Sequence, residues 1–167
     1  MAVPLLDLKA QHATIRDSVV NAMTKVVEDQ AFILGEPVER LERDVAKLSQ
    51  TTHAIGCANG TDAILLSLRA LDIARGDEVL TTPFTFFATA GAVHNVGARP
   101  VFADIDPDTF NLSAEAIAAN VKPATRAIIA VDLFGQMAPI ESIMDAAGDV
   151  PVIEDAAQSI GARRKVN

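Results

Sequence analysis

Two kinds of hydrophobic pattern divide the chain near residue 51. Before that point, apolar residues recur at helical spacing, which predicts one amphipathic helix from about Leu8 to Asp29 and another from about Pro37 to Leu48. Pro37 suits a first helical turn, where a missing N–H costs no hydrogen bond. We therefore expect residues 1–50 to form a helical arm and residues 51–167 to form a separate region.

From residue 51 onward, short apolar runs alternate with stretches of helical period. This alternation is typical of β-α-β units, and it predicts an α/β fold in three layers, α-β-α, around a mostly parallel sheet. The chain has 7 Phe and no Trp or Tyr, so Ala, Val, Ile and Leu must fill the core. The predicted strands are residues 53–58, 78–81, 99–102, 127–131 and 150–153, and the predicted helices are residues 61–70, 86–95, 114–119 and 140–147.

The charge balance excludes several kinds of partner. Fourteen basic and 22 acidic residues give a net charge of −8, which should repel nucleic acid and anionic membranes. The basic cluster Arg163-Arg164-Lys165 is interpreted as a solvated tail. No apolar run approaches the roughly 18 residues of a membrane helix, and the N-terminus lacks the pattern of a signal peptide.

A single cysteine, Cys57, rules out a disulfide within the chain and suits a reducing compartment, so we expect a cytoplasmic protein. Because Cys57 lies in an apolar, strand-like run, we expect an inert buried thiol. The three histidines have no suitably spaced Cys, His or Glu partners, so no metal site is expected.

Ligands of open α/β sheets bind beyond the carboxyl ends of the strands. There the chain has Asn59-Gly60-Thr61-Asp62-Ala63 at the start of a predicted helix. Gly60 would let a ligand approach the backbone, and the free N–H groups and the Thr61 hydroxyl could hold a phosphate. The same residues also suit an ordinary helix start, with Asn59 or Thr61 as the cap and Asp62 complementing the helix dipole.

Two further strand ends carry candidate ligand-binding groups. In Pro83-Phe84-Thr85-Phe86-Phe87, core packing would explain one or two of the rings, and Phe86 could instead stack on a planar ligand. In Glu154-Asp155-Ala156-Ala157-Gln158, a carboxylate at the end of a buried strand needs a cationic partner, unless it caps the next helix. Since neighbouring strand residues face opposite sides, Glu154 should point away from Asp155.

Taken together, five segments in this order resemble the DegT/DnrJ/StrS family of sugar aminotransferases, which have the type I aspartate-aminotransferase fold. The segments are Asn59-Gly60-Thr61-Asp62-Ala63, residues 83–89 (PFTFFAT), residues 104–112 (DIDPDTFNL), residues 131–136 (VDLFGQ) and residues 154–162 (EDAAQSIGA). The resemblance covers nearly the whole chain.

The resemblance implies pyridoxal 5'-phosphate (PLP) as cofactor. By position, Gly60, Thr61 and the Asp62 amide would seat its phosphate, and Phe86 would stack on its ring. Asp155 would pair with the ring nitrogen, and Gln158 would hydrogen-bond near the ring's 3-hydroxyl. The implied reaction moves an amino group, usually from glutamate, to a keto nucleotide-sugar for polysaccharide or glycoside synthesis, in a homodimer.

The resemblance also implies groups that residues 1–167 do not contain. Family members form a Schiff base through a lysine on a Ser-Phe-x-x-x-Lys segment, which the resemblance places beyond Asn167. We therefore assign no catalytic residue here, and Lys165 lacks that context. We therefore expect a truncated large domain that is inactive alone. Two alternatives stay open: a dehydratase of the same fold that uses pyridoxamine phosphate, and a non-catalytic ligand-binding module.

Overall fold

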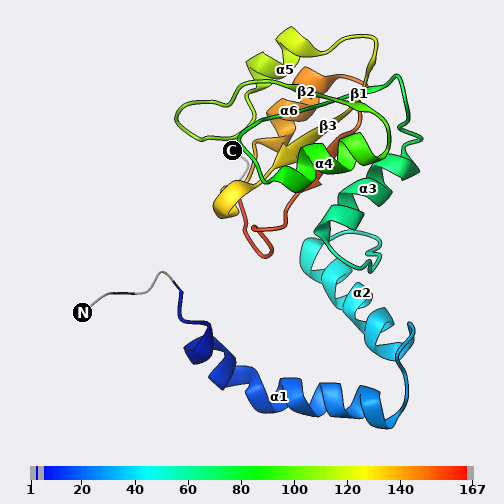
Figure 1. Ribbon diagram of the computed structural model, residues 1–167. Coiled ribbons are helices and arrows are strands. Elements are labelled where there is room, and N and C mark those ends of the chain that lie inside the picture. The colour runs from blue at the N-terminus through cyan, green and yellow to red at the C-terminus, as the bar shows by residue number, and fades with distance from the viewer. Residues whose placement is uncertain (1–2, 4–5, 165–167) are drawn as a thin grey trace. The chain divides into compact units, whose positions relative to one another are not determined.

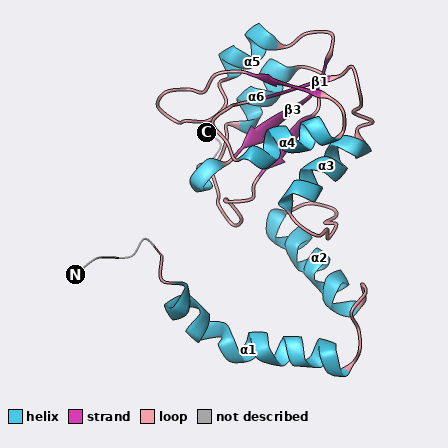
Figure 2. Cartoon of the chain, in the orientation of Figure 1, coloured by secondary structure: helices cyan, strands magenta, loops and turns pink. Residues whose placement is uncertain are grey.

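The computed structural model describes Val3 and residues 6–164 (Figure 1). The chain divides into two compact units, residues 1–56 and residues 57–167. Each unit has its own secondary structure, mainly helical in the first and mixed α/β in the second (Figure 2). No helix in the described part of the chain is both long enough and apolar enough to cross a lipid bilayer.

The first unit contains the two expected helices, α1 (Leu8–Glu28) and α2 (Glu36–Ser49). Asp7 caps α1, because its carboxylate accepts a hydrogen bond from the Ala10 N–H at 3.0 Å. Pro37 lies in the first turn of α2, and Gln50 ends that helix in a left-handed conformation. Both predictions of helices are confirmed, to within a residue or two at each end.

The strand predicted over residues 53–58 is wrong, because this segment is an irregular loop. A strand needs a neighbouring strand for its backbone groups, and here the Gly56 N–H donates instead to the Glu42 carboxylate of α2 at 2.7 Å. Most side chains of the loop are exposed, Ile55 among them. Cys57 is also exposed, so the expectation of a buried thiol is wrong too.

The second unit is built on a parallel sheet of four strands in the order β2-β1-β3-β4. The strands are β1 (Glu78–Thr81), β2 (Arg99–Phe102), β3 (Thr125–Val131) and β4 (Val152–Asp155). The four strands predicted after residue 70 are confirmed, with β4 displaced by two residues. Pro151 has no N–H to donate, so pairing along β4 begins after it and extends to Asp155.

Helices cover both faces of this sheet, as Figure 1 shows. On one face α3 (Gly60–Ala70) and α4 (Phe87–Asn95) pack against alternate strand residues, including Val79 and Ile129. On the other face α5 (Ala114–Asn120) and α6 (Ile140–Ala147) pack against the residues between them, including Leu80 and Ile128. The three-layer α-β-α fold is therefore confirmed.

The strand order determines where a ligand can bind. From β1 the chain moves outward to β2 through α4, then crosses back through α5 to β3 on the other side of β1. Right-handed connections in opposite directions place their helices on opposite faces, which leaves a crevice where the direction reverses. That point lies beyond the carboxyl ends of β1 and β3.

Candidate functional site

A cavity of about 230 Å³ lies at this reversal point. Its walls come from the start of α3, from the segment between β1 and α4, and from the residues that end or follow β3 and β4. Five of the six residues predicted from the sequence line it, and Asp62 does not. The lining residues are Gly60, Thr61, Ile64, Thr85, Phe86, Ala88, Val131, Asp132, Leu133, Asp155, Ala157 and Gln158.

The start of α3 combines a capped helix with an open backbone. The Asn59 side-chain oxygen accepts from the Asp62 N–H at 2.9 Å, and the Asn59 carbonyl accepts from the Ala63 N–H at 3.0 Å. The capping interpretation is thus confirmed for Asn59. Helix geometry gives the N–H groups of Gly60 and Thr61 no carbonyl within the helix. A Cβ placed on Gly60 would have no atom within 4 Å, so a ligand can approach the backbone there.

Phe86 caps α4 and lines the cavity with its side chain 73% exposed. The neighbouring Phe84 and Phe87 are exposed as well. Core packing therefore explains none of the three rings, contrary to the expectation that it would explain one or two. An exposed ring on a cavity wall offers a planar ligand an apolar face.

Asp155 is the last residue of β4 and lines the cavity. It accepts two hydrogen bonds, both at 3.3 Å, from the Thr89 hydroxyl and from the Ala157 N–H. Thr89 is fully buried in α4, and the Thr85 hydroxyl lies 3.0 Å from its oxygen. Within the described residues, no basic side chain forms an ion pair with Asp155.

Comparison with known proteins assigns this arrangement to a family. Residues 13–166 match the model of the DegT/DnrJ/EryC1/StrS aminotransferase family. The chain belongs to that family. It is 48% identical to a pleiotropic regulatory protein of Geobacillus stearothermophilus and 47% identical to a UDP-N-acetyl-3-dehydro-alpha-D-glucosamine 3-aminotransferase of Acidithiobacillus ferrooxidans.

These two matches cover 98% and 97% of this chain, but 44% of each relative, so the chain spans less than half of their length. Among solved structures, NtdA of Bacillus subtilis with bound PMP superposes with a TM-score of 0.90 at 32% identity. That match covers 95% of this chain and 37% of NtdA. The α/β fold and the family are both established by these similarities.

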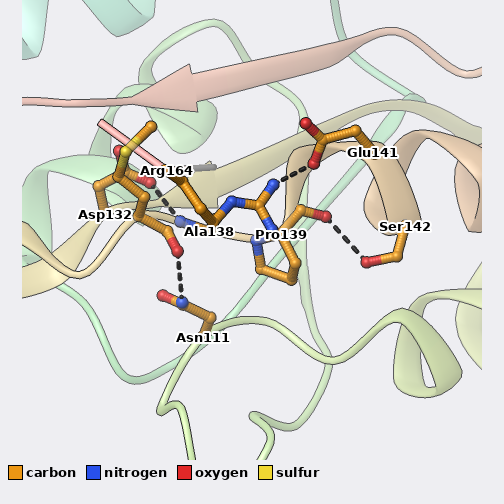
Figure 3. A network of polar contacts seen from close by, with 8 residues as sticks. Asn111, Asp132, Ala138, Pro139, Glu141, Ser142 and Arg164 are labelled. Carbon is orange, nitrogen blue, oxygen red and sulfur yellow. Dashed lines mark hydrogen bonds and ion pairs between the residues drawn. The ribbon is translucent and has the colours of Figure 1, made fainter. Parts of the chain in front are cut away.

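In this DegT/DnrJ/EryC1/StrS chain, Glu154 does not line the cavity, which agrees with the expectation from strand geometry. Burial raises the pKa of its carboxyl group, the negative charge of Asp132 raises that pKa further, and Arg164 opposes the shift. Arg164 also forms an ion pair with Glu141 of α6, as Figure 3 shows. Arg163 and Arg164 are both exposed, as expected of a solvated tail, and Lys165 lies outside the described residues.

Asp132 is a buried residue of the site that the sequence analysis missed as a candidate. It directly follows β3, lines the cavity, and accepts hydrogen bonds from the Ala138 N–H at 2.8 Å and the Ser159 hydroxyl at 2.7 Å. Figure 3 shows the bond to Ala138. The signal was available, since Asp132 ends an apolar run just as Asp155 does.

Gln158 lines the cavity and is hydrogen-bonded to the segment that follows β3. Its side-chain oxygen accepts a hydrogen bond from the Phe134 N–H at 2.7 Å, in the short 3-10 helix η1 (Leu133–Gly135). The amide NH₂ of Gln158 is not needed for that bond and can donate to a ligand. In the described residues, no three His, Cys, Asp or Glu side chains gather as a metal site would require.

Proposed function

We propose that residues 57–164 form the cofactor-binding part of a PLP-dependent aminotransferase that acts on a keto nucleotide-sugar. One observation carries the proposal. A single cavity combines the open N-terminus of α3, the exposed ring of Phe86 and the carboxylate of Asp155. These are the three kinds of group that a flat, phosphorylated pyridine ring requires.

Each part of the cofactor has a matching group in the cavity. The N–H groups of Gly60 and Thr61 would hold the phosphate at the positive end of the α3 dipole. The Asp62 N–H, which we also expected in this role, is donated to Asn59. Gln158 would donate its free NH₂ to the ring's 3-hydroxyl.

Asp155 would hold a proton on the ring nitrogen. A carboxylate with two long hydrogen bonds keeps acceptor capacity for a charged N–H donor, and such a bond is stronger than one between neutral groups. When bound, PLP supplies an electron sink for moving an amino group between substrates. Phe86 would fix the plane of the ring and exclude water from one of its faces.

The lysine that forms the Schiff base with the cofactor would come from outside residues 57–164. Within the described part of the chain, no lysine lines the cavity. The family pattern expects that lysine on a Ser-Phe-x-x-x-Lys segment, and the relatives are more than twice as long as this chain. We propose that residues 57–164 bind and orient the cofactor, and that other parts of the whole protein complete the catalytic site.

The substrates follow from the 47%-identical relative, which is named for a UDP-linked keto sugar. We propose a nucleotide-linked keto sugar as amino acceptor and glutamate as donor, in the synthesis of polysaccharide or glycoside precursors. We further propose a homodimer in the cytoplasm. The exposed thiol of Cys57 suits a reducing compartment, and the apolar face of α1 suits a subunit contact.

The role of Asp155 can be tested by titration with pyridoxamine 5'-phosphate, which lacks the aldehyde and so cannot react with surface lysines. Asp155→Asn should weaken binding by at least about tenfold, because a hydrogen bond to a charged group is lost. It should also weaken protonation of the ring nitrogen, which the ultraviolet spectrum of the cofactor reports.

Glu154→Gln is a matched control, since it removes the adjacent carboxylate on the opposite side of β4. It should leave both the affinity and the spectrum unchanged. Equal affinities for wild type and Asp155→Asn would refute the role of Asp155. No binding to the wild-type chain would refute the cofactor site.

A further inference from the structure

A second cavity, of about 380 Å³, adjoins the proposed cofactor cavity. Its walls come from the segment after β1, from the loop after β2 and from η1 with the residue that follows it. Leu133 lines both cavities, and the consecutive residues Phe84 and Thr85 line one each. The two cavities are therefore neighbours along the carboxyl edge of the sheet.

Three of the seven aromatic residues of the chain surround this second cavity. Phe84, Phe110 and Phe134 are 42%, 56% and 81% exposed. The rings of Phe84 and Phe110 lie with centroids 6.0 Å apart and are tilted by 36°. Exposed phenylalanine rings contribute little of their apolar area to the folded core, and a cluster of them is a candidate binding surface.

Two of these phenylalanines have an unusual backbone conformation that hydrogen bonds stabilise. Phe110 has φ +60° and Phe134 has φ +57°, a region that bulky side chains rarely adopt. The Phe110 N–H donates to the Asp106 carbonyl at 2.8 Å, and the Phe134 N–H donates to Gln158 at 2.7 Å. The backbone at both residues is thus held in place before any ligand binds, which reduces the entropy lost on binding.

The polar groups of the cavity select an uncharged ligand with hydroxyl groups. Among the residues that the structure describes, no Lys, Arg or His lines it, and Asp108 adds a carboxylate that would repel a diphosphate. Asp106 holds the same loop, and hydrogen bonds from the backbone and hydroxyl of Thr109 lower the pKa of its carboxyl group. Thr109 and Gln136 supply further hydrogen-bonding side chains. Flat apolar faces with carboxylate, hydroxyl and amide groups match the two sides of a pyranose ring.

We propose that this second cavity binds the hexose ring of the amino acceptor, with its C–H face on Phe110 and Phe134 and its hydroxyls on Asp108 and Thr109. The proposal rests on the proposed function, which makes the acceptor a sugar. The reacting carbon belongs to that ring and must reach the cofactor cavity. The hexose, rather than the distant base of the nucleotide, therefore belongs in the adjoining cavity.

The test is saturation-transfer NMR on the chain with UDP-N-acetylglucosamine as the probe, together with titration by pyridoxamine 5'-phosphate. Asparagine tolerates positive φ, so Phe110→Asn and Phe134→Asn remove a ring while keeping the backbone conformation. Each should weaken the saturation of the pyranose protons by about three- to tenfold, as the loss of an aromatic contact predicts. Asp108→Asn, which keeps the side-chain size, should weaken it as well.

Phe102→Asn is the matched control, because Phe102 is an exposed phenylalanine on β2 that lines neither cavity. It should leave the saturation unchanged. The proposal is overturned if only the uracil protons are saturated, if the pyranose protons are not, or if their signal survives both ring removals. In each of these outcomes, normal binding of pyridoxamine 5'-phosphate would still support the proposed cofactor site. Loss of that binding in the wild type, with pyranose saturation intact, overturns the proposed function instead.

Discussion

Glu154 and Asp155 are adjacent carboxylates with different surroundings. Burial and the nearby charge of Asp132 raise the pKa of Glu154 above its ordinary value of 4.5. A carboxyl group with a raised pKa in the folded state favours folding while it is protonated, and this contribution is lost as pH rises through the folded-state pKa. We therefore predict that Glu154→Gln stabilises the chain at neutral pH, by roughly 0.5 kcal/mol for a partly exposed charge, and that this advantage disappears near the ordinary pKa.

Urea unfolding at about pH 4 and about pH 7 measures this difference. Glu115→Gln provides a control of opposite sign, because the hydrogen bond from the Ser113 hydroxyl lowers the pKa of Glu115. Its contribution is present above the ordinary pKa and is lost as pH falls, so Glu115→Gln should destabilise the chain at neutral pH only. A Glu154→Gln effect that is the same at both pH values would contradict the prediction.

Asp132 is buried and joins two segments that are distant in the sequence. Its two oxygens accept from Ala138, which precedes α6, and from Ser159, which follows β4. Asparagine can still accept from the Ala138 N–H, but it turns an NH₂ donor toward Ser159, so Asp132→Asn loses the charge-assisted bond from the Ser159 hydroxyl. We predict a loss of about 1–3 kcal/mol in the free energy of unfolding, measured by urea denaturation.

Asp104→Asn is the control for this change. The Asp104 carboxylate is exposed and accepts only from the N–H of the next residue, Ile105, at 2.8 Å. Its replacement should change the free energy of unfolding by less than about 0.5 kcal/mol. If the two variants lose the same stability, the buried bonds of Asp132 do not hold these segments together.

At the scale of elements, the cap of α3 affects both stability and the proposed phosphate site. Asn59→Ala removes the bond to the Asp62 N–H and should cost about 1 kcal/mol of stability. Asn59→Asp keeps the cap but loses the bond that the Asn59 amide donates to the Asp62 carboxylate at 3.0 Å, so it too should lose some stability. It also adds a negative charge beside the phosphate, so it should weaken the binding of pyridoxamine 5'-phosphate more than Asn59→Ala does. Thermal unfolding and titration measure the two effects separately.

Ser113 provides the comparison, because it caps α5 on the other face of the sheet through a bond to the Ala116 N–H. Ser113→Ala should lower stability by a similar amount, about 1 kcal/mol, without changing the affinity for the cofactor. A weaker affinity in Ser113→Ala would mean that stability alone controls binding. Unchanged affinity in Asn59→Asp would argue against a phosphate at α3.

Local pattern predicted most elements of the second unit, because buried parallel strands are continuous apolar runs that end at turn residues. The segment of residues 53–58 has the same composition, yet its Gly56 N–H bonds to Glu42 fourteen residues earlier. A pattern read over neighbouring residues cannot predict a contact between residues so far apart in the sequence. Nor could pattern indicate that Phe84 and Phe87 are exposed, since exposure depends on which residues of other elements pack against them.

For the site, the sequence predicted which residues follow each strand but not how they are hydrogen-bonded. Gly60, Phe86 and Asp155 meet at one cavity because the carboxyl ends of parallel strands lie at one edge of the sheet. The donation of the Asp62 N–H to Asn59 and the bond from Phe134 to Gln158 depend on side-chain conformations that the sequence alone does not determine.

At the scale of the whole molecule, α1 is a long helix without a buried residue. Its large apolar side chains cluster on one face and remain exposed, among them Ile15, Val19, Val20, Met23 and Val27. An amphipathic helix is stable chiefly when its apolar face is covered. The proposed homodimer would cover this face with a second subunit, since a contact of this kind buries apolar area on both partners.

We therefore predict that the chain associates, and that Val19→Lys together with Met23→Lys raises the dissociation constant by roughly a hundredfold or more, since two apolar side chains leave the contact and two charges enter it. Sedimentation equilibrium measures the constant. Asn21→Lys adds a charge on the opposite face of α1 and should change it little. A monomeric wild-type chain, or equal weakening by Asn21→Lys, would show that this face does not join two subunits. The apolar face would then be covered within the whole protein, and the proposed dimer would need a different surface.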